Sequence, residues 1–179
     1  MVVPEGMFLD KARQAVIKNF RCVPGVTLKR VKARALQLCE ELGLDNLQKS
    51  VSAAKGLSLE VFFAAKTHKE MMPFRAIVTQ RDSWQLHVSS FLLRHLSSLR
   101  LDDPFVVRNS EALVDYLRAD NPGSCSLVSF DVEDMYYSIP HSELMRAVDE
   151  CIESSGSIAF MSASGISGDS FLELLRFYL

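Results

Sequence analysis

The stretch Leu127-Val-Ser-Phe-Asp-Val-Glu-Asp-Met-Tyr-Tyr-Ser-Ile-Pro140 contains the pattern on which the fold prediction depends. Ser126 to Asp131 is predicted to be a strand, because apolar and polar residues alternate from Val128 to Val132. Its apolar face would consist of Val128, Phe130 and Val132. Asp131 would then project from the opposite face, where a carboxylate on a rigid element suits a hard cation such as Mg²⁺. Judged from this segment alone, an aspartate at a strand end more often hydrogen-bonds to a turn than binds a metal ion.

A second alternating pattern lies upstream. Apolar residues recur at every second position from Leu57 to Ala65, and again from Phe74 to Val78. The polar stretch Lys66-Thr-His-Lys-Glu-Met-Met-Pro73 separates them, which predicts an antiparallel hairpin with a basic tip. Because strand neighbours point to opposite faces, Arg75 should point away from whatever Phe74, Ala76 and Val78 bury.

These segments resemble reverse transcriptases when taken in order. Ser129-Phe-Asp-Val-Glu-Asp-Met-Tyr-Tyr-Ser-Ile-Pro140 is similar to their motif A, in the version SFDVxxxYxxIP found in Penelope-like retroelements. Lys66-Thr-His-Lys69, followed by Pro73-Phe-Arg-Ala-Ile-Val78, resembles the fingers motif KxHK…RPIV. Phe105-Val-Val-Arg-Asn-Ser110 resembles the segment that precedes motif A. The likeness extends from about Leu57 to Leu179 and, more weakly, over the helices before it. Two motifs in the right order are more specific than either alone.

The resemblance implies an RNA-directed DNA polymerase of Penelope-like or non-LTR retroelement type, which uses two Mg²⁺ ions. Asp131 would be the catalytic residue and a metal ligand, and Tyr136 would lie under the sugar and obstruct a 2′-hydroxyl. The nucleotide-binding residues it implies are Lys66, Lys69, Arg75, Val132 and Tyr136. Its partners would be an RNA template, a DNA primer and deoxynucleoside triphosphates, with no membrane and no obligate protein partner. We expect an intracellular, nuclear protein.

The implied fold is α+β: a helical N-terminal part, a fingers hairpin and a partial right-hand palm. The corresponding ranges are 1–56 for the helical extension, 57–100 for the fingers hairpin and its helix, and 101–179 for the partial palm. Two features depart from the family. Ala76 stands where the family has proline, and the aromatic-x-Asp-Asp motif that supplies further carboxylates does not occur in the sequence. We therefore expect a chain truncated before that motif and inactive alone.

Helical periodicity predicts most of the remaining elements. Caps, turns and apolar stripes predict six helices. The first three are Leu9–Phe20, a helix that begins after an N-cap at Thr27 and ends at Gly43, and Trp84–Leu99. The other three run from Asn109 or Ser110 to Arg118, from Pro140 to Ile152, and from about Ser170 onward. His95 lies inside an apolar stripe and is interpreted as a core or edge histidine rather than as a ligand. The basic run Lys29–Arg34 is interpreted as a solvated helix face. Residues 153–170 are rich in Ser and Gly and are predicted to be a loop.

Composition limits the functional classes. Residues 1–100 contain 16 Lys/Arg against 8 Asp/Glu, and residues 101–179 contain 4 against 14. This asymmetry is compatible with a polyanion partner for the first part. The four cysteines form no CxxC pair and no zinc-ligand spacing, so we expect reduced thiols. Two alternatives remain open: a non-catalytic nucleic-acid-binding remnant of a transposon, and a plain helical interaction domain.

Overall fold

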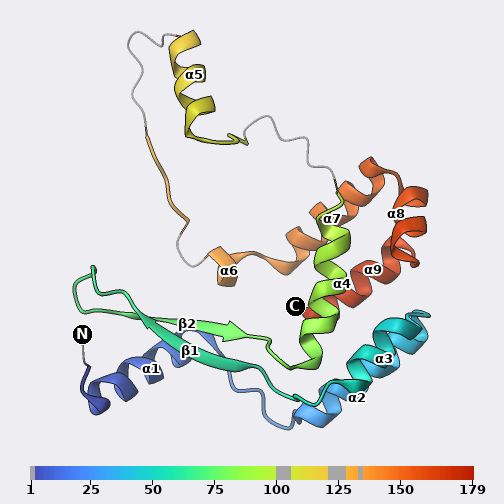
Figure 1. The fold of residues 1–179 in the computed structure, drawn as a ribbon, viewed down its shortest axis with the longest axis horizontal. Helices are drawn as coiled ribbons and strands as arrows, with labels where there is room; N and C mark the ends of the chain where they lie inside the picture. Colours follow the sequence, from blue (N-terminus) through green and yellow to red (C-terminus); the bar gives the residue numbers. More distant parts are fainter. Residues whose placement is uncertain (1–2, 100–105, 121–127, 133–134) are drawn as a thin grey trace.

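Helices and a single antiparallel hairpin form the part of the chain that the computed structural model describes, which is residues 3–99, 106–120, 128–132 and 135–179 (Figure 1). The elements in chain order are α1 (Glu5–Asn19), α2 (Leu28–Glu41), α3 (Asp45–Ala53), β1 (Glu60–Ala65), β2 (Phe74–Thr79), α4 (Trp84–Leu96), α5 (Ser110–Asp120), α6 (Met135–Ser138), α7 (His141–Ser155), α8 (Ser157–Ser164) and α9 (Gly168–Tyr178). The predicted α+β class is therefore confirmed at this coarse level.

The helix ends follow the local sequence signals. The side chain of Thr27 accepts a hydrogen bond from the backbone N–H of Arg30 (3.3 Å), so Thr27 caps α2 as predicted. Just beyond the end of α2, Gly43 has a φ of +69°, a left-handed conformation that glycine adopts without steric cost. At the start of α5, Asn109 Oδ1 accepts from the N–H of Ala112 (2.8 Å).

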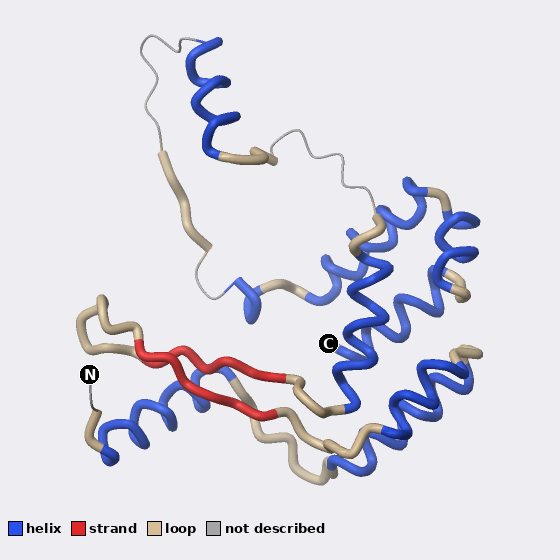
Figure 2. Tube along the Cα trace, viewed as in Figure 1, coloured by secondary structure: helices blue, strands red, loops and turns tan. Residues whose placement is uncertain are grey.

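The hairpin packs one face against α1. Strands β1 and β2 pair in a register that places Phe63 opposite Ala76 and Ala65 opposite Phe74. Phe8 of α1 makes edge-on ring contacts with Phe63 (centroids 6.1 Å apart) and Phe74 (5.3 Å). We call these three rings, with the buried alanines of α1 and Ala76, the hairpin cluster. Figure 2 shows α1 running along this hairpin, which contains all the strand residues described.

The main core lies among the helices. Its most deeply buried apolar side chains are Leu38 and Cys39 of α2, Val51 of α3, Val88 of α4, Ile152 of α7, and Phe171 and Leu174 of α9. This helical core joins residues from all three ranges proposed from the sequence. His95 of α4 is also buried, as predicted, and its ring contacts those of Phe91, Phe160 and Phe171.

Two sequence-based predictions about secondary structure are wrong. Residues 153–170 are not a loop, because they end α7 and contain all of α8. Between Gly156 and Gly165 the apolar run Ile158–Met161 forms that helix, and Phe160 contributes to the helical core. The glycines therefore mark the ends of a short helix rather than a loop. Helix α3, which begins only two residues after Gly43, was also not predicted from the sequence.

The predicted strand at 126–131 is the second error. Residues 128–132 have no regular secondary structure, and 126–127 lie outside the described residues. The apolar side chains expected to anchor the strand are exposed: 70% for Val128, 90% for Phe130 and 63% for Val132. A strand needs a neighbouring strand to satisfy its backbone N–H and C=O groups, and in the described structure this segment has none. Alternation alone therefore did not produce a strand.

Among the described residues, no helix has both the length and the apolar character needed to cross a lipid bilayer.

Candidate functional site

Arg75 lies on the open face of the hairpin. It is the second residue of β2 and pairs with Ala64 of β1. Its neighbours Phe74 and Ala76 face α1, so the alternation of the strand directs Arg75 to the other side, where it is exposed. The predicted orientation of Arg75 is confirmed. The predicted apolar face is shorter than expected, because Val78 is exposed rather than buried.

The tip of the hairpin presents lysines on a folded turn. The N–H of Lys66 donates to the carbonyl of Pro73 (3.0 Å), and the N–H of Lys69 donates to the carbonyl of Lys66 (3.1 Å). Lys69 is exposed, and Lys66 is half-buried. Lys11 of α1 donates through its ammonium to the carbonyl of Met71, which connects the tip to the helix beneath it. The basic tip predicted from the sequence therefore stands on a hydrogen-bonded scaffold.

The motif around Asp131 lies in the irregular segment 128–132, where Asp131 and Val132 are exposed. Tyr136 lies in the four-residue helix α6, and its side chain is outside the described residues. Glu133 and Asp134 are also outside them. The carboxylate of Asp131 is thus accessible to solvent and is not enclosed in the apolar interior.

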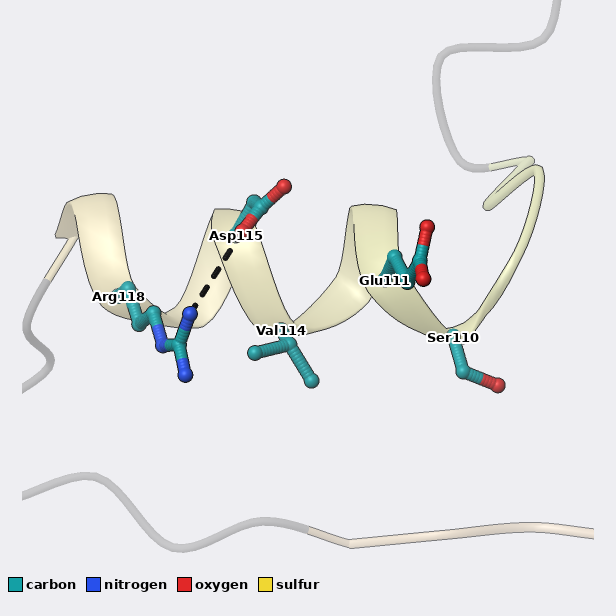
Figure 3. A pocket seen from close by; sticks show the side chains of 5 residues that line it. All are labelled: Ser110, Glu111, Val114, Asp115 and Arg118. Atoms are coloured by element: carbon teal, nitrogen blue, oxygen red, sulfur yellow. Dashed lines mark ion pairs between the residues drawn. The ribbon is translucent and has the colours of Figure 1, made fainter.

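Two hollows on the described part of the chain, one on α5 and one at the junction of α3, α4 and α8, are lined by neither Asp131 nor Arg75. In Figure 1 the segment 128–132 runs separately from β1 and β2. The hollow shown in Figure 3 has a volume of about 460 Å³ and contains neither residue. All its lining side chains come from α5, where Arg118 and Asp115 form an exposed ion pair at 4.0 Å. Because one helix supplies the whole lining, this hollow is an open surface rather than a cleft.

The described residues do not fit a magnesium centre. Within the described ranges, no three His, Cys, Asp or Glu side chains are grouped so that they could hold a metal ion. Two catalytic metals need several carboxylates, and Asp131 supplies one.

A second hollow, of about 540 Å³, lies at the junction of α3, α4 and α8 and was not predicted from the sequence. Its lining includes Lys49, Arg94 and His95. The one sequence signal that could have pointed to it is Gly43, which ends α2 and allows another helix to begin at once. The elements that form the hollow are far apart in the sequence, so periodicity could not have assembled them.

Comparison of the chain with protein-family models, with curated proteins and with solved structures found no match.

Proposed function

We propose that this chain supplies the fingers hairpin and the motif A segment of a retroelement reverse transcriptase, of Penelope-like or non-LTR type. The observation that carries the proposal is the pair of motifs in the expected order, Lys66–Val78 and then Ser129–Pro140. Arg75 is exposed on the hairpin face opposite Phe74. This position supports the nucleotide-binding role that the resemblance implies.

Arg75 has the chemistry and the support for binding phosphate. A guanidinium presents several N–H donors in a planar fork, which matches the oxygens of a phosphate or triphosphate. The strand that bears Arg75 is held by its pairing with β1 and by the ring contacts of Phe74 and Phe63 with Phe8. Lys66 and Lys69 add positive charge at the same end of the hairpin. RNA template, DNA primer and deoxynucleoside triphosphates are the proposed ligands.

The isolated chain should not synthesise DNA. Its 179 residues contain no aromatic-x-Asp-Asp motif, so Asp131 lacks the carboxylates that a two-metal site needs. In a primer-extension assay with an RNA template and Mg²⁺, we expect no product above that of a chain carrying Asp131→Ala. Metal-dependent extension by the unmodified chain, abolished by Asp131→Ala, would contradict this expectation.

Arg75→Ala should weaken binding of a primer–template hybrid with a matched deoxynucleoside triphosphate by about tenfold, the usual loss for one charge-assisted hydrogen-bonding group. Fluorescence anisotropy of a labelled RNA–DNA hybrid, titrated at several salt concentrations, measures both affinity and its salt dependence. Arg30→Ala is the matched control, because it removes the same charge from the exposed face of α2.

Equal losses for Arg75→Ala and Arg30→Ala would show that only total charge matters and would contradict the assigned role of Arg75.

The alternative, a non-catalytic nucleic-acid-binding remnant, is tested with Asp131→Ala. If affinity and Mg²⁺-dependent nucleotide binding are both unchanged by that substitution, the remnant is the correct description. If Mg²⁺-dependent nucleotide binding falls, the polymerase assignment of Asp131 is supported.

A further inference from the structure

The hollow at the junction of three helices has the features of an anion site. One wall is the start of α3, the second is the C-terminal turn of α4 with Arg94 and His95, and the third is the end of α8 with Ser164 and Gly165. Leu44, Leu47 and Ser164 are buried, and Ser164 Oγ donates to the carbonyl of Phe160 (2.8 Å). The walls are therefore fixed by the helical core, in contrast to the single-helix surface on α5.

The start of α3 presents free donors. The preceding residue, Leu44, provides no side-chain cap, and in the described part of the chain no acceptor receives the backbone N–H groups of Asp45, Asn46 or Leu47. Unsatisfied N–H groups and the partial positive charge of the helix dipole favour an anion at this end. Lys49 and Arg94 line the same hollow, and both residues are exposed.

His95 is a second, independent indication of a ligand. His95 is only 8% exposed, and it lines the hollow. Within the described ranges its ring contacts only aromatic neighbours, and its nitrogens form no hydrogen bond. Burial, and then the charge of Arg94, lower the pKa of His95 below its ordinary value of 6.5. Near neutral pH the imidazole is therefore uncharged and keeps one N–H that can donate to a ligand oxygen.

We propose that this hollow binds a phosphate group, held by the N–H groups at the start of α3 and by the side chains of Lys49, Arg94 and His95. The site goes beyond the proposed polymerase function, since it involves neither the hairpin nor Asp131. The Asp45 carboxylate also lines the hollow and opposes an anion there. The phosphate can belong to a small phosphorylated molecule or to a nucleic-acid strand.

Titration of the isotopically labelled chain with inorganic phosphate, followed by amide NMR, tests the proposal. We expect saturable shifts of the Asp45, Asn46 and Leu47 amides. Arg94→Gln should weaken binding about tenfold, because it removes a charge-assisted donor. Asp45→Asn should strengthen binding severalfold, because it removes the repelling charge. Arg30→Gln on α2 should leave the affinity unchanged within about twofold, since Arg30 does not line the hollow.

Short oligonucleotides with and without a 5′-phosphate identify the source of the phosphate. Shifts from the phosphorylated form alone indicate a terminal phosphate, and equal shifts from both indicate backbone phosphates; either result supports the site. The absence of saturable shifts with inorganic phosphate and with both oligonucleotides would overturn it. A weaker affinity after Asp45→Asn, or an unchanged affinity after Arg94→Gln, would do the same. An effect of Arg75→Ala on hybrid binding alone leaves this site intact, so the two proposals fail separately.

Discussion

Replacing Phe171 by alanine should lower the free energy of unfolding by about 3–5 kcal/mol, the range for truncating a fully buried aromatic residue. Phe171 is 0% exposed and lies in the middle of the helical core. Its ring packs edge-on against Phe160 with centroids 5.0 Å apart, and it also contacts Phe91 and His95. Alanine would leave a cavity between helices that cannot collapse fully. Urea unfolding monitored by circular dichroism measures the change.

Phe62→Ala is the matched control for Phe171→Ala, because it removes the same atoms from a site that is 52% exposed on the open face of the hairpin. Its expected cost is under about 1 kcal/mol. If the two substitutions reduced the free energy of unfolding equally, the helical core would not be the main source of stability.

Gly56→Ala should lower the free energy of unfolding by about 2–3 kcal/mol, through overpacking against backbone atoms. Gly56 lies between α3 and β1, and its N–H donates to the carbonyl of Asp82 (3.1 Å) just before α4. A Cβ at this position would lie 2.4 Å from the Asp82 carbonyl oxygen. Because the obstacle is backbone, and Asp82 already has a φ of +56°, relief requires the two chain segments to separate.

Gly6→Ala provides the control for Gly56→Ala. Gly6 lies in α1, and a Cβ there would meet nothing within 4 Å. This substitution should raise stability by about 0.5–1 kcal/mol, since alanine has the higher helix propensity. The same chemical change is therefore expected to have opposite signs at the two positions. Thermal and urea unfolding of both variants give the comparison, and a neutral Gly56→Ala would contradict the close approach.

The sequence was sufficient where structure depends on near neighbours. Three predicted features follow from the spacing of residues within a single helix or strand. They are the Thr27 cap of α2, the apolar stripe of α4 that buries His95, and the strand alternation that exposes Arg75. These features depend on hydrogen bonds and faces that a few consecutive residues determine. The fold class could be predicted for the same reason.

Prediction failed where distant segments decide the outcome. Residues 128–132 alternate as a strand does, but strand formation needs a partner strand that their own sequence cannot supply. Helix α8 was mistaken for a loop because its glycines and serines outweighed the short apolar run around Phe160, which is buried only through contacts with other helices. The hollow beside His95 required α3, α4 and α8 to meet, which no local pattern encodes.

The separation between the hairpin cluster and the helical core has a consequence for how such a protein can diversify. Phe8, Phe63 and Phe74 support the hairpin that bears Arg75, while a different set of side chains holds the helices together. The hairpin can therefore change in length or charge without disturbing the interior of the helical part. Gly56 limits both parts, because it pairs with Ser83 at the point where the chain passes from the helices into the hairpin.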